Sequence, residues 1–278
     1  MFKLKEGEEF MNYHMLVLDL DGTLTNAKKE ISTETKEALM KLQKQGVTLV
    51  LASGRPTFGI EPLAKELELR EHGGFIVSFN GGRVIDCKEN KVIFEQTIKE
   101  ERIPQIVKLA KEHNVNLLTH KDNYILTNDE TDTYVQIEGK INKMPVVEDK
   151  NLEQAISFPV IKFIMLGDGE YLAEVEPSVK DALGEKFSVY RSEPFFLEIM
   201  AEGIDKAQSL QRLLDYLGRE KDGMVACGDG YNDISMVEFA GLGVAMKNGN
   251  DTIKEKADYV TEKTNDENGI VEVIEKFF

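Results

Sequence analysis

Two aspartates separated by a single residue, Asp19 and Asp21, are the side chains of this sequence best suited to chemistry. They follow a short apolar run, residues 15–18, which predicts a buried strand. Side chains two apart on a strand point to the same side, and Gly22 allows a sharp turn directly afterwards. Two carboxylates held this close repel each other unless a cation or a proton lies between them. The pattern therefore indicates bound Mg²⁺ and a protonated carboxyl or, taken alone, an Asx-type turn that only ends a strand.

Three further segments favour the chemical interpretation. A second apolar, β-branched run, residues 47–52, leads into Ser53 and a glycine, whose hydroxyl and backbone N–H groups can face an anion. A third run, residues 224–227, ends in the polar segment 228–233. Lys206 lies near the start of a predicted helix, where an ammonium could neutralise a phosphate. Taken one at a time, these three segments could be a strand-end cap, a helix cap and a solvated lysine. Together with the aspartate pair, however, all four segments in this order are not a plausible coincidence.

Together the four segments resemble the motifs of the haloacid dehalogenase superfamily of phosphohydrolases. The long interval between Ser53 and Lys206 is similar to the Cof-type sugar-phosphatase branch, whose cap domain is inserted there. The resemblance covers about residues 13–278 and implies an α/β phosphatase that depends on Mg²⁺. The residues that match the motifs are Asp19, Asp21, Gly22, Thr23, Ser53, Lys206, Gly228, Asp229, Asn232 and Asp233.

For catalysis, the resemblance implies that Asp19 attacks phosphorus and forms an aspartyl-phosphate. Asp21 is then the general acid that protonates the leaving oxygen and later the base that deprotonates water. Mg²⁺ would be bound by the carboxylates of Asp19 and Asp229 and by the backbone carbonyl of Asp21. Asp233 is expected to act on the metal through water or to orient Lys206.

The groups that bind the substrate follow from the same resemblance. Hydrogen-bond donors and a cation are expected to hold the phosphoryl oxygens: the Leu20 and Gly54 amides, Ser53, Lys206 and Asn232. Contacts to the leaving group are less defined, because polar residues at strand ends are usually only solvated. The candidates for substrate specificity are Arg55, His120, Tyr124 and Arg191.

The elements that must position these residues alternate between strand and helix. A helix capped by Ser32 and ended by Gly46 follows the first strand, and a helix over residues 59–69 and a strand over residues 75–78 follow the second. This order predicts a doubly wound parallel sheet with a Rossmann-like core, in which ligands bind at the carboxyl ends of the strands. The motif residues except Lys206 fall at such ends.

The pattern changes over residues 83–194, where a hairpin, short strands and two helices predict a small α+β layer. We interpret this segment as the inserted cap. The core is then formed by residues 13–82 and 195–278, and residues 1–12 are expected to be an N-terminal extension or a tag.

Composition limits the partners. A formal net charge of −16 argues against nucleic acid or an anionic membrane as partner. No apolar run approaches the roughly 20 residues needed to span a membrane, and residues 1–9 lack a signal-peptide core. The two cysteines, Cys87 and Cys227, indicate no disulfide framework and fit a reducing cytoplasm. The predicted partner is therefore a small phosphorylated molecule, bound in the cytoplasm.

Other functions are possible on such a scaffold. A phosphomutase or sugar phosphotransferase would use the same residues but would have to exclude water from the aspartyl-phosphate. A non-enzymatic phospho-receiver or binding module ranks last, because receivers are smaller and have no cap of this length. A membrane cation pump shares the nucleophile motif but needs transmembrane helices, which the sequence does not contain.

Overall fold

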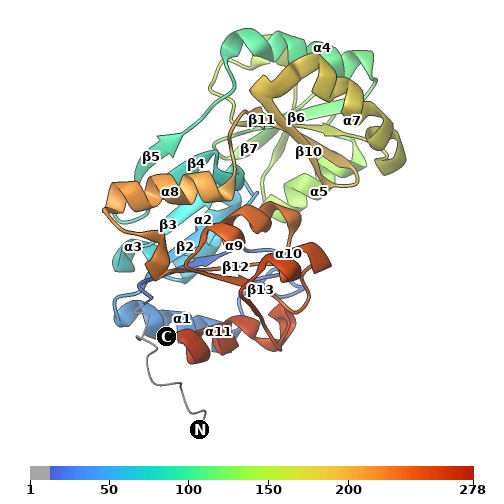
Figure 1. The fold of residues 1–278 in the computed structure, drawn as a ribbon. Helices are drawn as coiled ribbons and strands as arrows, with labels where there is room; N and C mark the ends of the chain where they lie inside the picture. The colour runs from blue at the N-terminus through green and yellow to red at the C-terminus, as the bar shows by residue number, and fades with distance from the viewer. Residues whose placement is uncertain (1–12) are drawn as a thin grey trace. The chain divides into compact units, whose positions relative to one another are not determined.

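The computed structural model describes residues 13–278, and the predicted extension at residues 1–12 lies outside the described residues. The chain divides into two compact units, one formed by residues up to Val50 together with Leu214–Phe278, the other by Leu51–Leu213. The division falls inside strand β2 (Thr48–Ala52) and inside helix α8 (Lys206–Leu217). Figure 1 labels most of the helices and strands of both units.

The first unit contains a parallel sheet with the strand order β14-β13-β12-β1. Pairing is parallel throughout these four strands, with Met15 opposite Met224 and Val225 opposite Leu242. All four residues of β1 are fully buried, as the apolar run predicted. The strands are β1 (Met15–Leu18), β12 (Met224–Gly228), β13 (Leu242–Ala245) and β14 (Tyr259–Val260).

Helices cover both faces of this sheet. In Figure 1, α1 and α11 lie together on one side of the strands and α9 and α10 on the other. The predicted cap of the first helix is confirmed, because the Ser32 hydroxyl oxygen accepts a hydrogen bond from the Thr35 N–H at 3.1 Å. The helices are α1 (Thr33–Lys44), α9 (Ile234–Phe239), α10 (Asp251–Lys256) and α11 (Gly269–Phe277).

The second unit begins with the strand order β2-β3-β4-β5. Strand β3 (Phe75–Ser78) has the predicted bounds, and the hairpin of β4 (Arg83–Asp86) and β5 (Lys91–Glu95) pairs antiparallel with it. The helix predicted over residues 59–69 is wrong in one respect: it is two helices, α2 (Thr57–Glu66) and α3 (Leu69–His72). They are separated because Glu68 has a left-handed backbone with φ of 52°.

A second, mostly antiparallel sheet of the same unit has the order β10-β11-β9-β6-β7-β8. Its side chains alternate between two cores. Phe163 and Leu197 pack with α4 and α7, whereas Ile164 and Phe196 pack with α5. The strands are β6 (Asn116–Lys121), β7 (Tyr124–Thr127), β8 (Val146–Glu148), β9 (Lys162–Leu166), β10 (Phe187–Glu193) and β11 (Phe196–Ala201); the helices are α4 (Ile103–Glu112), α5 (Thr133–Asn142), α6 (Leu152–Ala155) and α7 (Gly169–Leu183).

The mixed α/β architecture is as predicted, while some details were missed. Neither α5 nor β8 was predicted from the sequence. Sheet membership changes between β5 and β6 and again after β11, so the strands change sheets close to the predicted cap limits but not at them. The cap boundaries at residues 83 and 194 therefore stay a prediction.

Candidate active site

Three carboxylates converge at the ends of the parallel strands of the first unit. Asp19 directly follows β1, Asp229 directly follows β12, and Asp233 ends the short 3₁₀ turn η5 (Tyr231–Asp233). Each offers one carboxylate oxygen, and these oxygens all lie within 4.8 Å of one another. Asp19 and Asp233 are buried, so the cluster is mostly withdrawn from water. The parallel pairing of β1 with β12 explains the convergence, since it places the carboxyl ends of both strands at one edge.

The carboxylate of Asp229 is held from several sides. The Thr23 hydroxyl donates to its Oδ1 at 2.8 Å, and the backbone carbonyl of Asp229 accepts from the N–H of Asn250 at 3.1 Å. Gly22, with φ of 88°, lies directly against this carboxylate. The Asn248 side-chain amide in turn donates to the Gly22 carbonyl at 2.7 Å.

Asp233 braces the loop that carries Asp229. Its Oδ2 accepts hydrogen bonds from the backbone N–H groups of Asp229 and Gly230 at 3.0 and 2.9 Å. A carboxylate that accepts two N–H groups fixes the start of this loop as well as adding negative charge to the cluster. Its predicted action on the metal through water, or on Lys206, stays a prediction.

The side chain of Asp21 makes a different contact. Its Oδ1 lies 2.6 Å from the ammonium of Lys29, and both side chains are partly exposed. Lys29 belongs to a tight turn in which the Asn26 side chain accepts from the N–H groups of Lys28 and Glu30. Lys29 was not predicted from the sequence, although a turn-forming asparagine, Asn26, followed by lysines so soon after the aspartate pair was a usable signal. The predicted role of the Asp21 backbone carbonyl stays a prediction.

The second unit contains Ser53 and its neighbours. Ser53 follows β2, and its N–H donates to the Val77 carbonyl of β3 at 2.9 Å. The buried Ser53 hydroxyl oxygen accepts from the Arg55 N–H at 3.2 Å. Gly54, between them, is half-buried. This loop is therefore held by β3 at its start and by an internal hydrogen bond at its turn.

Lys206 is the first residue of α8 and is completely buried. The preceding residue, Asp205, accepts a hydrogen bond from the Gln208 N–H at 2.9 Å and so caps the helix. A buried ammonium is costly unless it is paired or hydrogen-bonded. Of the other predicted phosphate-binding residues, Leu20 is buried and Asn232 is exposed.

The predicted specificity residues differ in their surroundings. His120 is buried, and its Nε2 lies 2.9 Å from the Glu138 carboxylate. Tyr124 is half-buried, and Arg191 is exposed and paired with Glu176 at 2.9 Å. The Arg55 guanidinium donates to the Gly59 carbonyl at 3.4 Å. Contact of any of these residues with a leaving group stays a prediction.

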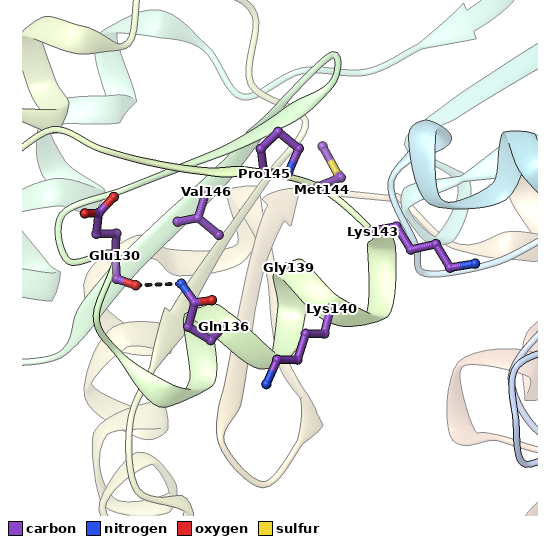
Figure 2. Close-up of a pocket in the computed structure, with 8 residues that line it drawn as sticks. All are labelled: Glu130, Gln136, Gly139, Lys140, Lys143, Met144, Pro145 and Val146. Carbon is purple, nitrogen blue, oxygen red and sulfur yellow. Dashed lines mark hydrogen bonds between the residues drawn. The ribbon is translucent and has the colours of Figure 1, made fainter.

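A cavity of about 520 Å³ lies beside α5 and β8 in the second unit (Figure 2). The Gln136 side-chain amide donates to the Glu130 carbonyl at 2.7 Å across one wall. None of the predicted site residues is among those that line it, which are Glu130, Gln136, Gly139, Lys140, Lys143, Met144, Pro145 and Val146.

Both cysteines are free thiols. Burial raises the pKa of the Cys227 thiol, and burial followed by the charges of Asp86 and Glu61 raises the pKa of Cys87 to about 12. Thiolates, not thiols, are the reactive form. These pKa shifts therefore disfavour a catalytic role for either cysteine. Across residues 13–278, none of the helices is both long enough and apolar enough to cross a membrane.

A parallel sheet with carboxylates at the ends of its strands defines an α/β protein of the doubly wound type. The family model described as haloacid dehalogenase-like hydrolase matches residues 16–274. The chain therefore belongs to the haloacid dehalogenase-like hydrolases, as the motifs predicted, and it is a phosphatase of that family.

Individual relatives agree. The chain is 29% identical to 5-amino-6-(5-phospho-D-ribitylamino)uracil phosphatase YcsE of Bacillus subtilis, over 96% of each chain. It is 47% identical to a haloacid dehalogenase-like hydrolase from Bacteroides thetaiotaomicron of known structure, with a TM-score of 0.92 over 96% of this chain and 100% of that one. The HAD subclass IIB sugar phosphatase BT4131 is 26% identical, with a TM-score of 0.79 over 95% and 98% of the two chains.

Proposed function

We propose that this phosphatase hydrolyses small phosphorylated metabolites, sugar phosphates in the first place, with Mg²⁺ and through an aspartyl-phosphate on Asp19. The observation that carries the proposal is the convergence of the Asp19, Asp229 and Asp233 carboxylates at the ends of β1 and β12. Membership of the hydrolase family supports the reaction class.

The cluster fits a hard divalent cation, because carboxylate oxygens are the ligands that Mg²⁺ prefers. Asp19 and Asp229 would hold the ion directly, together with the Asp21 backbone carbonyl, and Asp233 would act through water. When bound, Mg²⁺ neutralises negative charge on the phosphoryl group and so lets an anionic nucleophile approach it.

Asp19 and Asp21 would carry the phosphoryl group and the proton through both steps of the reaction. A carboxylate oxygen of Asp19 forms a bond to phosphorus while the bond to the leaving oxygen breaks, and Asp21 gives that oxygen a proton. Asp21, now a carboxylate, takes a proton from water, whose oxygen attacks phosphorus and releases Asp19. Phosphoryl oxygens would be held by Ser53, the Leu20 and Gly54 amides, Lys206 and Asn232.

The substrate class is supported by relatives. BT4131 is described as a sugar phosphatase, and YcsE as a phosphatase of a phosphoribityl compound. Both descriptions place the phosphate on a sugar or sugar-derived chain, and an acidic protein of net charge −16 must concentrate its cations where such an anion binds. The two free cysteines agree with a cytoplasmic enzyme.

A phosphatase screen tests the proposal. Hexose phosphates, pentose phosphates, flavin mononucleotide and pyridoxal phosphate would be offered with and without Mg²⁺. We expect Mg²⁺-dependent phosphate release, with the highest kcat/KM on a sugar phosphate. Asp19→Asn should abolish it, whereas Asp86→Asn, which changes another buried aspartate on β4, should not. If a folded Asp19→Asn protein kept more than about a tenth of the wild-type kcat, the covalent mechanism would be wrong.

The role of Asp21 and the transferase alternative need separate tests. Asp21→Asn should slow sugar phosphates more than p-nitrophenyl phosphate, whose leaving group needs little protonation. Equal losses on both substrates would contradict the acid role. A phosphomutase would accumulate phosphoenzyme and require a bisphosphate activator, so phosphate release equal to leaving-group release without an activator would exclude it.

A further inference from the structure

A chain of hydrogen bonds between buried and half-buried groups runs through the second unit to the loop that contains Ser53. The Asn80 side-chain amide donates to the Tyr190 hydroxyl at 2.6 Å, which donates to Glu198 Oε2 at 3.2 Å. The other oxygen of Glu198 lies 3.0 Å from the ammonium of Lys162. Lys162 also donates to the backbone carbonyl of Gly54 at 3.1 Å.

The sheet places these charges on one face. Strand pairing sets Tyr190 opposite Glu198, and Lys162 is two residues before Ile164, the partner of Glu198 on β9. This face is the one opposite α4 and α7. The Lys162 and Glu198 side chains are only 2% and 5% exposed. A buried ion pair often contributes little to stability, so stability alone does not explain why Lys162 and Glu198 are buried beside Gly54.

The bond to Gly54 acts on the hydroxyl of Ser53. The Gly54 carbonyl and the Arg55 N–H belong to one planar peptide unit. Lys162 donates to the carbonyl of this peptide, and the Arg55 N–H of the same peptide donates to the Ser53 hydroxyl oxygen. A cation on the carbonyl polarises the peptide and strengthens the N–H as a donor. With its oxygen occupied from this side, Ser53 directs its own proton elsewhere.

The rest of the chain of hydrogen bonds keeps Lys162 in place. Burial and the charge of Glu198 raise the pKa of Tyr190 well above its usual value, so this hydroxyl stays a neutral donor to Glu198. Both oxygens of Glu198 are thus engaged. Asn80 links this chain of hydrogen bonds back to Ser53, because the backbone N–H of Asn80 donates to the Ser53 carbonyl at 2.9 Å.

We propose that Lys162 is a positioning residue for phosphate binding. Through the Gly54–Arg55 peptide it orients the Ser53 hydroxyl to donate to a phosphoryl oxygen, and Glu198 holds its ammonium in place. This inference rests on the proposed function, in which Ser53 binds the phosphoryl group.

Four variants test it: Lys162→Met, Glu198→Gln, the double variant and Thr119→Val. Thr119 is the matched control, since its buried hydroxyl donates to the Lys162 backbone carbonyl and not to its ammonium. The measurements are the inhibition constant of inorganic phosphate, kcat and KM for p-nitrophenyl phosphate, and Tm by circular dichroism.

Lys162→Met and the double variant should raise the inhibition constant of phosphate by about tenfold or more, the loss of a hydrogen bond worth about 1.4 kcal/mol. Glu198→Gln keeps an amide oxygen that can accept from the Lys162 ammonium, so this variant and Thr119→Val should lower Tm but leave this constant within about threefold of the wild type. A purely structural pair would behave differently, because phosphate affinity would then follow Tm across the series.

The inference is overturned if the double variant binds phosphate like the wild type, or if Glu198→Gln weakens phosphate as much as Lys162→Met. Should Lys162→Met fail to fold because it leaves Glu198 unpaired, the double variant, which leaves no unpaired charge, decides. Failure of the proposed function is distinguishable, since the wild type itself would then neither hydrolyse p-nitrophenyl phosphate nor bind phosphate, and both proposals would fall.

Discussion

Alanine at position 22 should displace the Asp229 carboxylate. A Cβ built on Gly22 would lie 2.3 Å from Asp229 Oδ2 and 2.8 Å from its Cγ. The carboxylate cannot retreat without cost, because Thr23 holds its Oδ1 and Asp233 holds the Asp229 N–H. One of these contacts must therefore break in Gly22→Ala.

The size of the effect has two parts. Alanine in the left-handed backbone of Gly22, with φ of 88°, costs about 1–2 kcal/mol. Loss of the hydrogen bond from Thr23 to a charged oxygen costs about 1.5–3 kcal/mol more. We expect the free energy of unfolding to fall by about 2.5–5 kcal/mol in total. Because Mg²⁺ requires near-ideal octahedral geometry, the Mg²⁺ concentration for half-maximal activity should rise by at least about tenfold.

Gly46→Ala is the matched control, since Gly46 has φ of 92° but no atom within 4 Å of an added Cβ. It should lose only the backbone part, about 1–2 kcal/mol, and keep the wild-type Mg²⁺ requirement. Urea unfolding followed by circular dichroism gives the stabilities, and Mg²⁺ titration of p-nitrophenyl phosphate hydrolysis gives the metal requirement. If the two variants lose equal stability and need equal Mg²⁺, Gly22 does not support Asp229 and our reasoning on the cluster is refuted.

Three further predictions concern other residues. Asp233→Asn should raise the Mg²⁺ requirement about tenfold in the same titration, because a neutral amide replaces the bracing carboxylate; an unchanged requirement would argue against bracing. Burial alone would raise the pKa of Glu138. The hydrogen bond to His120, the charge of His120 and smaller contributions outweigh burial, so the pKa of Glu138 lies below its ordinary 4.5. Glu138 should therefore stabilise the protein above pH 4.5 and lose this contribution at lower pH. Urea unfolding of Glu138→Gln should then show lower stability at neutral pH and a flatter acid dependence than the wild type, and an unchanged acid dependence would contradict the lowered pKa of Glu138. Arg191→Ala breaks a partly exposed ion pair worth at most about 1 kcal/mol, so Tm should barely change. A severalfold higher KM for the best sugar phosphate, with the KM for p-nitrophenyl phosphate unchanged, would identify Arg191 as a leaving-group contact. An unchanged substrate ranking would exclude this contact.

The elements that carry the motifs could be predicted because their signals are local. Strands β1 and β3 are short, mostly apolar runs, and their predicted bounds agree with the structure. The cap of α1 needs only Ser32 three residues before Thr35. The convergence of Asp19 with Asp229 followed from parallel pairing, which the alternation of strands and helices indicates.

The missed elements depend on distant partners. Helix α5 buries Glu138, Gly139 and Asn142 along with Val135, so it shows no apolar stripe in sequence. Glu138 is buried only because His120, 18 residues earlier, pairs with it. No propensity rule can supply such a partner.

Sequence patterns alone do not distinguish a buried lysine or arginine from a solvated one. Among residues 13–278, Lys162 and Lys206 are the only lysines or arginines that are buried, in a protein with 34 of these residues in all. Burial of a cation costs free energy unless the fold provides partners, so each such position requires a reason. For Lys206 the reason was visible in its motif. For Lys162 it became visible only through the Gly54 carbonyl 108 positions earlier. That both buried lysines bear on proposed phosphate contacts is what we expect of an acidic protein that must gather positive charge for an anionic substrate.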